Sequence, residues 1–373
     1  MRTLLQISLA ISLSASLFAQ APGLTGPPSG NNQKASVTQF IGPVKISIDY
    51  SSPAVRDRRG QIWGKLVPYG MADLGVLGGK LSPWRGGANE NTVFTISDPV
   101  TIEGQTLPAG KYGLHFIPGQ DEWTIIFSKD AEAWGSFFYD DSHDALRVKV
   151  KPAKHEYREW LTYEFPVRRP AEATAELQWE ELSVPWHIKV DNVGDIYVTK
   201  IRQELKGSFG FNPKYYDAAA QICVQEGTHL EDALNWADLA INNPAIGQTN
   251  FDTLSTKALV LSKMGRDADA QTIMQTALRH PTASAIQIHT YGRQLLTAGK
   301  KQEALDVFKL NAERNGDAWP VNVGLARGYM AVGDYPKALE YAQKAVAQAP
   351  DNQNKSNLEA MVKSLADGKA YAN

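Results

Sequence analysis

The sequence is short of several features that would point to a chemistry. It has one cysteine, Cys223, among 373 residues, so an intramolecular disulfide is excluded. Its net charge is −2, and no basic surplus indicates a nucleic-acid partner. It contains no CxxC, HExxH or GxSxG motif and no glycine-rich phosphate loop, and its seven histidines are scattered. The sequence therefore predicts no metal site, no cofactor and no nucleic-acid partner.

Apolar runs long enough to span a membrane are also missing, and the one near the N-terminus is short. The chain starts "MRTLLQISLAISLSASLFAQ", with one arginine, an apolar stretch interrupted by serine, and then Ala19. This pattern is typical of a secretory signal peptide cleaved after Ala19. We expect residues 1–19 to be the signal peptide and residues 20–35, rich in Pro, Gly, Asn and Gln, to be a flexible leader. The mature protein would be periplasmic or extracellular, with no transmembrane segment.

Residues 36–190 alternate between apolar and polar side chains in short runs. In "VKISIDY" Val44, Ile46 and Ile48 share one face, and "KYGLHFI" and "WTIIF" repeat this pattern between turns rich in Gly and Pro. Many short alternating strands predict an antiparallel β-sandwich or a jelly-roll-like barrel.

The remaining residues have a helical period and repeat. A connecting helix is expected at 191–210, and residues 211–373 are predicted to be all-α. Gly265, Gly299 and Gly333 are spaced by 34 residues, and two sets of small residues keep the same spacing: Ala258, Gly292, Ala326 and Ala270, Ala304, Ala338. This is the tetratricopeptide period. The sequence predicts three regular helical hairpins, one degenerate hairpin before them and a closing helix at about 354–367. A tetratricopeptide-like groove holds peptide or protein partners.

Polar and aromatic residues that could form a site gather in two stretches of the β-region, 51–70 and 82–96. The candidate ligand-binding residues are Arg56, Arg58, Trp63, Tyr69, Trp84, Arg85, Asn89, Glu90 and His115. Arginine forks bind carboxylates and other anions, and aromatic platforms beside planar polar groups suit glycans. The alternative is structural: the arginines pair with Asp49, Asp57 and Glu90, and Arg85, Asn89 and Glu90 satisfy one another in a loop.

Two histidine positions allow opposing interpretations. His115 alternates with Leu114 and Phe116, so it is expected to face solvent or a cleft. The stretch 139–146 carries Asp140, Asp141, His143 and Asp144, but it lacks the glycine and closing glutamate of a calcium loop. A solvated turn before the next strand is the favoured interpretation of that stretch.

The β-region resembles a known family in several ordered motifs. "YSSPAVRDRRGQIWGKLVPYG", "WRGGANENTVFTIS", "VTIEGQTLPAGKYGLHFIPGQDEWTIIFSK" and "LRVKVKP" resemble the bacterial domain-of-unknown-function 2911 family. The resemblance implies that Trp63, Gly64, Tyr69, Trp84, Arg85, Gly87, Ala88, Asn89 and Glu90 occupy family-pattern positions. It also implies export, often with tetratricopeptide repeats following, but it supplies no reaction. Residues 71–83 interrupt the family pattern as an insertion.

These features favour an exported binding or scaffold protein over an enzyme. The alternative is a hydrolase acting on glycans or peptides, or a glycan-binding module, that uses the Arg85/Asn89/Glu90 cluster. A glycoside hydrolase needs a pair of carboxyl groups, and only Glu90 is evident in the cluster.

Overall fold

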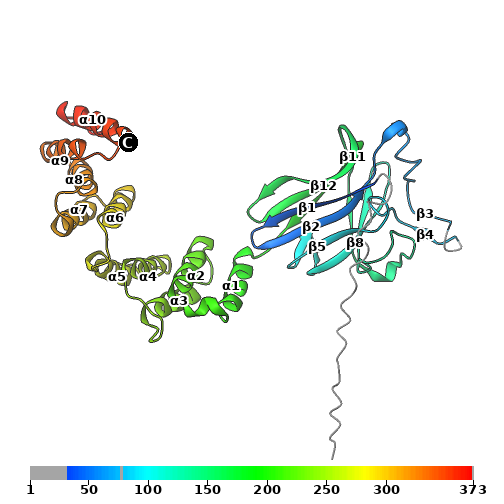
Figure 1. Cartoon of the computed structure of the whole chain (residues 1–373), viewed down its shortest axis with the longest axis horizontal. Helices are drawn as coiled ribbons and strands as arrows, with labels where there is room; N and C mark the ends of the chain where they lie inside the picture. Colours follow the sequence, from blue (N-terminus) through cyan, green and yellow to red (C-terminus); the bar gives the residue numbers. More distant parts are fainter. Residues whose placement is uncertain (1–31, 76–78, 372–373) are drawn as a thin grey trace, which may run out of the picture. The chain divides into compact units, whose positions relative to one another are not determined.

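The computed structural model describes residues 32–75 and 79–371 and divides the chain into two compact units, with the division after Val193 (Figure 1). We call residues 32–190 the β-domain and residues 194–371 the repeat domain. The expected signal peptide and most of the expected leader lie outside the described residues. The first strand begins at Gln33, so the last three residues assigned to the flexible leader are in fact part of a strand. None of the described helices is long and apolar enough to cross a membrane.

Two antiparallel sheets face each other in the β-domain (Figure 1). The six-stranded sheet has the order β1 (Gln33–Ile41), β2 (Val44–Ser52), β5 (Thr92–Ile96), β8 (Gly110–Ile117), β9 (Trp123–Ser128) and β10 (Asp144–Val150). The four-stranded sheet has the order β11 (Ala153–Arg169), β12 (Glu172–Lys189), β6 (Val100–Ile102) and β7 (Gln105–Leu107). The predicted strand-rich sandwich is therefore present.

The core between the sheets follows from the alternation of the strands. Val44, Ile46 and Ile48 on β2 are fully buried, and β9 buries Trp123, Ile125 and Phe127 in the same way. Aromatic pairs join the two sheets. The rings of Tyr50 on β2 and Tyr163 on β11 lie 4.8 Å apart, and those of Phe116 on β8 and Trp186 on β12 lie 6.3 Å apart. Such edge-to-face pairs add to the stabilisation that burial gives.

The insertion between the two family-like motifs forms a small hairpin of its own. Its strands are β3 (Ala72–Asp73) and β4 (Leu81–Ser82), paired Ala72 to Ser82 and Asp73 to Leu81. The Asp73 carboxylate accepts a hydrogen bond from the backbone N–H of Gly75 at 2.8 Å, which stabilises the turn out of β3.

The repeat domain consists of helical hairpins (Figure 1). Helix α1 (Val193–Glu204) packs through Val198 against α2 (Pro213–Glu226) and α3 (Leu230–Asn242). Three regular hairpins follow: α4 (Phe251–Lys263) with α5 (Asp267–Arg279), α6 (Ala285–Thr297) with α7 (Lys301–Asn315), and α8 (Trp319–Ala331) with α9 (Tyr335–Ala347). Helix α10 (Asn352–Ala366) closes the array. Cys223 is fully buried on α2, and burial raises the pKa of its thiol to about 11, so it packs as a small apolar residue.

The 34-residue period has a direct structural cause. Gly265, Gly299 and Gly333 lie just past the ends of α4, α6 and α8, with φ of 75°, 77° and 85°. Glycine adopts this left-handed conformation without the strain that a Cβ would add, and it ends each first helix of a hairpin. The small residues at the other two periodic sets are buried where paired helices meet.

One buried aromatic residue depends on glycines around it. Phe308 of α7 is fully buried against Gly292 of α6 and against Gly324 and Gly328 of α8. A Cβ on Gly292 would lie 2.3 Å from Phe308, and one on Gly324 would lie 2.5 Å from it. The helices can approach Phe308 only because these positions have no side chain.

We therefore expect Gly292→Ala to destabilise the repeat domain by about 1–3 kcal/mol through overpacking. At an open helical position the same change would stabilise by up to about 1 kcal/mol, so the sign of the effect tests the contact. Urea unfolding followed by circular dichroism at the helical band measures it. The penalty should shrink in a Phe308→Leu background. An unchanged or increased stability of Gly292→Ala alone would contradict this packing.

Candidate functional site

The residue pair Trp84 and Phe116 determines how the candidate residues are arranged. The backbone N–H of Trp84 donates to the Phe116 carbonyl at 2.8 Å, and the Trp84 carbonyl accepts from the Phe116 N–H at 2.7 Å, so the two residues form an isolated antiparallel bridge ahead of β5 in the chain. Side chains paired in this way point to the same face, and their neighbours along the chain point to the opposite face. Trp84 therefore lies with Phe116 on the core side, while Arg85 and His115 share the outer side.

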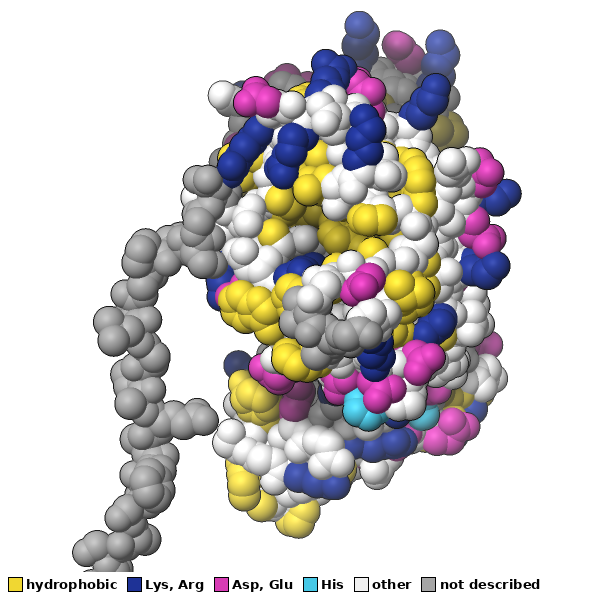
Figure 2. All heavy atoms as spheres, turned by 90° about the vertical axis from the view of Figure 1, so that its right-hand side faces the viewer, with side chains coloured by type: hydrophobic (Ala, Val, Ile, Leu, Met, Phe, Trp, Pro, Cys, Tyr) yellow, Lys and Arg dark blue, Asp and Glu magenta, His cyan; other side chains and the backbone are white. Residues whose placement is uncertain are grey.

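On the core side, Trp84 belongs to a cluster of four tryptophans. The Trp63 ring is 5.2 Å from Trp123 and 5.7 Å from both Trp84 and Trp179, in each case nearly edge to face. Trp123 and Trp179 are buried, while Trp63 and Trp84 are half-buried. The face of the β-domain in Figure 2 has a hollow where hydrophobic side chains gather, with Lys and Arg side chains along its upper border. The two half-buried tryptophans extend the core toward solvent rather than standing on the surface as isolated platforms.

On the outer side, the guanidinium of Arg85 is half-buried and has no carboxylate partner among the described residues. It donates from Nη1 to the carbonyl oxygen of Asn89 at 2.6 Å, and its Cζ lies 4.9 Å from the centroid of the Phe137 ring. The backbone of Gly135 approaches so closely that a Cβ there would lie 2.5 Å from Nη1. Burial lowers the pKa of Arg85. Its contacts are therefore with the Asn89 carbonyl and with the loop between β9 and β10, not with the Glu90 carboxylate.

His115 does not face solvent, as the alternation of β8 suggested. It is only 2% exposed, with its ring 5.6 Å from that of Tyr139 and its Nδ1 2.9 Å from Oγ of buried Ser136. Burial, and then the positive charge of Arg85, lower its pKa to about 4, so the imidazole is neutral at neutral pH. The strand pattern does place His115 opposite the core, but residues 129–143 cover that face.

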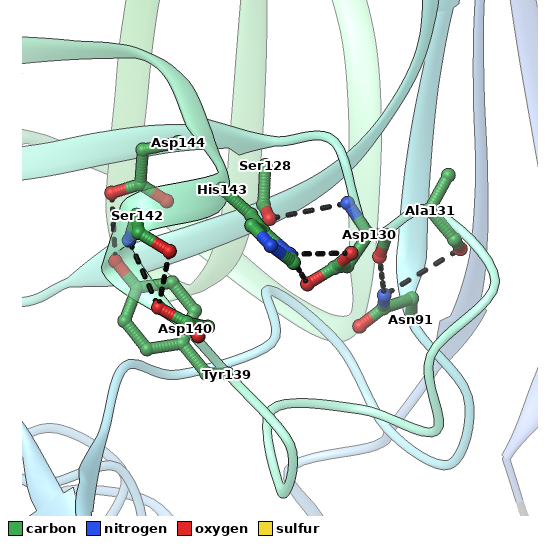
Figure 3. A network of polar contacts seen from close by, with 9 residues as sticks. All are labelled: Asn91, Ser128, Asp130, Ala131, Tyr139, Asp140, Ser142, His143 and Asp144. Atoms are coloured by element: carbon green, nitrogen blue, oxygen red, sulfur yellow. Dashed lines mark hydrogen bonds and ion pairs between the residues drawn. The ribbon is translucent and has the colours of Figure 1, made fainter.

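Asn91 also contacts the 129–143 segment, although it was not among the candidate residues chosen from the sequence. Its side-chain amide donates to the carbonyl oxygen of Asp130 at 2.8 Å, with a longer contact of 3.5 Å to that of Ala131 (Figure 3). It is buried one residue before β5. Its position directly after Glu90, in a stretch already rich in polar residues, was the only signal that could have found it.

The tight turn between Arg85 and Asn91 depends on its backbone conformations. Gly86 has φ of 62°, and a Cβ there would lie 2.6 Å from both Phe116 and the Tyr163 hydroxyl. The carbonyl oxygen of Gly86 accepts hydrogen bonds from the Tyr163 hydroxyl at 2.6 Å and from Thr92 Oγ1 at 3.2 Å. Asn89 is also left-handed, with φ of 60°, a conformation that asparagine tolerates better than most residues. Gly86 and Asn89 therefore have a structural role, because their backbone conformations form the turn.

Glu90 has partners on the first two strands. Its Oε1 lies 3.1 Å from Nζ of Lys34, and its Oε2 accepts from Ser51 Oγ at 3.2 Å. A hydrogen bond from its own backbone N–H lowers the pKa of Glu90, with further lowering from Lys34 and Ser51. The expectation that Arg85, Asn89 and Glu90 satisfy one another is therefore only half correct, because Arg85 reaches Asn89 while Glu90 is bonded elsewhere.

The arginines of the first motif stabilise a loop against the four-stranded sheet. Arg58 donates to the carbonyl oxygens of Ala54 at 2.6 Å and Val55 at 3.1 Å, and the backbone N–H of Arg56 donates to Glu159 Oε1 at 2.8 Å. Arg59 forms an ion pair with Glu181. These contacts differ from the pairs with Asp49, Asp57 and Glu90 that the sequence suggested.

Tyr69 is 44% exposed and lies over Gly64, where a Cβ would come within 2.6 Å of its ring. Eight of the nine candidate residues divide into three groups: the loop arginines, the tryptophan cluster with Tyr69, and the face that holds Arg85, Asn89 and His115. Glu90 belongs to none of the three. Within the described residues no second acid and no histidine contacts Glu90, and no cluster of three or more His, Cys, Asp or Glu could hold a metal ion. The geometry assembles no acid–base pair around Glu90.

Two histidines in this region should titrate at very different pH. His115 should change its charge only near pH 4, whereas exposed His143 should titrate above its ordinary value, because a hydrogen bond to Asp130 raises the pKa of His143. NMR titration of the imidazole Cε1–H signals measures both. A His115 signal that moves near pH 6.5 would contradict the buried placement.

The lowered pKa of His115 also makes the stability of the β-domain depend on pH. Because the folded-state pKa of His115 is below its unfolded value, the unfolded chain binds more protons between pH 6.5 and about 4. The free energy of unfolding should fall as pH falls through this window, by on the order of 3 kcal/mol in full. His115→Gln, which can still hydrogen-bond to Ser136, should show a shallower fall in urea unfolding.

The β-domain and the repeat domain are similar to different groups of known proteins. Residues 32–188 match the family model described as "Protein of unknown function (DUF2911)". No curated protein matches the chain in a sequence search.

Among solved structures, the chain is similar to YrrB, described as a TPR protein with an unusual peptide-binding site, at 21% identity over 43% of this chain and 81% of that one (TM-score 0.30). It is similar to the C-terminal part of a TPR repeat-containing protein from Cytophaga hutchinsonii, at 16% identity over 47% and 68% (TM-score 0.36). A thermophilic TPR protein from Thermus thermophilus is 17% identical over 45% and 88% (TM-score 0.31).

The β-domain motifs, the match over residues 32–188 and the 34-residue helical period lead to one assignment. Residues 32–188 match the DUF2911 family model, and the helical hairpins that follow repeat with the 34-residue tetratricopeptide period.

Proposed function

We propose that this protein is an exported scaffold whose repeat domain holds an extended peptide segment of a partner protein. The observation that carries the proposal is a groove of about 1010 Å³ along the repeats, lined by side chains from α2, α4, α5, α6 and α7. A volume of that size accommodates several residues of an extended chain, and helical repeats commonly bind peptides in such grooves.

The lining of this groove suits a polypeptide backbone. Five glutamines contribute to it: Gln221, Gln225, Gln271, Gln287 and Gln294. Gln221 and Gln287 already bond to neighbouring side chains, so Gln225, Gln271 and Gln294 are the ones available to a peptide. A carboxamide can donate and accept at once, so it can pair with peptide N–H and C=O groups whatever the peptide sequence. Serine and threonine hydroxyls add further hydrogen-bonding groups to the same lining.

Apolar side chains in the same groove would hold a partner's side chains. Leu259 on α4 is 45% exposed and Ile286 on α6 is 52% exposed, and both line the groove. Large aliphatic side chains left open beside polar groups are the usual composition of an interaction site. Arg85 and Glu90 have separate structural partners, so no hydrolase built on that cluster is proposed.

Export is the other half of the proposal, and it is supported by the sequence of residues 1–19. When the whole chain is expressed in a bacterial host, the protein recovered outside the cytoplasm should begin at Gln20. Intact-mass measurement and N-terminal sequencing check this. Recovery of only the uncleaved chain from the cytoplasm would contradict export.

The groove can be tested with peptides selected from a random display library on the mature protein. Leu259→Asp combined with Ile286→Asp should weaken the selected peptides by about tenfold or more in fluorescence anisotropy, because a desolvated carboxylate would replace each apolar contact. Val332→Asp is the matched control, since Val332 is 39% exposed just past the end of α8 and outside the groove lining. Equal affinity of the groove variant and the control would reject the groove as the binding site.

A further inference from the structure

The connection between β9 and β10 is far longer than the strands require. The two strands are antiparallel neighbours in the sheet, with Ser128 paired to Asp144, yet the connection takes all of residues 129–143. Hairpin connections are usually about 2–5 residues long, and long loops in compact domains are usually functional. The ends of this loop are tied by a hydrogen bond from the N–H of Lys129 to the carbonyl oxygen of His143, at 3.0 Å. It has the form of an Ω-loop.

Three side chains, one on β8 and two in the chain that leads to β5, hold this loop. Asn91 bonds the carbonyl oxygen of Asp130, His115 contacts Ser136, and Arg85 lies against the Phe137 ring. Each of these anchors is buried or half-buried and outside the apolar core, so holding the loop accounts for their burial.

Bonds within the loop and to β10 add to its order (Figure 3). Asp130 accepts from His143 at 2.8 Å, and the Tyr139 hydroxyl donates to Asp144 at 2.8 Å. Arg147 then donates to the Tyr139 hydroxyl at 2.7 Å. The loop is therefore fixed at both ends and in the middle.

This fixed loop displays large aromatic side chains to solvent. Trp134 is 52% exposed and Phe138 is 64% exposed, whereas Ser136 and Tyr139 between and beside them are buried. Burying a large apolar side chain stabilises a folded protein by roughly 1.5–3 kcal/mol. At Trp134 and Phe138 much of this stabilisation is missing, because both side chains are exposed. Aromatic residues are the commonest energetic anchors of protein interfaces.

The charge of the loop indicates the partner. It carries Asp130, Glu132, Asp140 and Asp141 against one lysine, Lys129. Asp130 is paired with His143, and Asp140 accepts from Ser142 at the start of a short 3-10 turn. Within the described part of the chain, Glu132 and Asp141 have no ion-pair partner within about 4 Å, the distance that defines such a pair. An acidic surface repels anionic lipid headgroups and attracts lysine and arginine.

We propose that the 129–143 loop is a docking surface for a basic segment of a partner protein, one in which Lys or Arg alternates with apolar side chains. Trp134 and Phe138 contact the apolar groups and can also hold cations over their ring faces, while Glu132 and Asp141 attract the charged groups. This surface is on the β-domain and does not depend on the repeat groove.

The test uses the full mature protein and a labelled peptide of alternating Lys and Leu, followed by fluorescence anisotropy. The matched probe has Glu in place of every Lys. The basic peptide should bind, with affinity falling as salt rises, and the acidic peptide should not. Trp134→Ala combined with Phe138→Ala should weaken the basic peptide about tenfold or more. Glu132→Gln with Asp141→Asn should weaken it less and flatten the salt dependence.

Controls separate this surface from the rest of the molecule. Phe40→Ala and Phe211→Ala remove aromatic side chains that are 58% and 80% exposed elsewhere, and both should retain binding. The groove variant Leu259→Asp/Ile286→Asp should also retain it. All the altered loop residues are exposed, so unchanged circular dichroism is expected of each variant.

Four results with the peptides would overturn the proposal. They are no binding of the basic peptide, equal binding of the acidic peptide, retention of affinity by the loop variant, and loss of affinity in the groove variant. Co-sedimentation of the protein alone with phosphatidylcholine vesicles, lost in Trp134→Ala/Phe138→Ala, would instead assign the aromatic pair to a lipid surface and would equally overturn it.

Discussion

The backbone bridge between Trp84 and Phe116 is the constraint on which the rest of the β-domain's loop structure depends. It fixes the register of the Trp-Arg dipeptide against β8, so consecutive side chains are assigned to opposite faces. Trp84 joins the aromatic cluster, and Arg85 lies beside His115 under the 129–143 loop. A shift of one residue would place a guanidinium among tryptophans and an indole beneath a polar loop, and both exchanges would be unfavourable.

The repeat domain rests on a different kind of constraint, the absence of side chains where helices cross. Phe308 fills a space bounded by three glycines, and the glycines at the helix ends set the hairpin turns. Asn311 stands where the repeat usually has a small apolar residue, and it is fully buried. Its amide donates to the Ala285 carbonyl at 2.9 Å, and its oxygen accepts from Asn315 at 2.8 Å. A departure from the repeat pattern is thus stabilised by a satisfied polar contact between α6 and α7.

Local regularity is what the sequence predicted well. The alternation on β2, β8 and β9 and the 34-residue spacing each follow from a periodic contact, so the strands and the hairpins could be placed without the structure. What failed were pairings across long distances in sequence. Glu90 is bonded to Lys34 and Ser51 on earlier strands, and His115 is covered by a loop that follows the next strand. No pattern near Glu90 or His115 encodes those partners, because sheet topology brings them together.

The β3–β4 hairpin has a consequence for engineering of the β-domain. Its own pairs, Ala72 to Ser82 and Asp73 to Leu81, close the inserted segment before Trp84 is reached. The register of Trp84 against Phe116 is therefore insulated from the length of chain between Asp73 and Leu81. That segment is a permissive position for an epitope or a fluorophore, because a graft there leaves both the aromatic cluster and the Arg85 face in register.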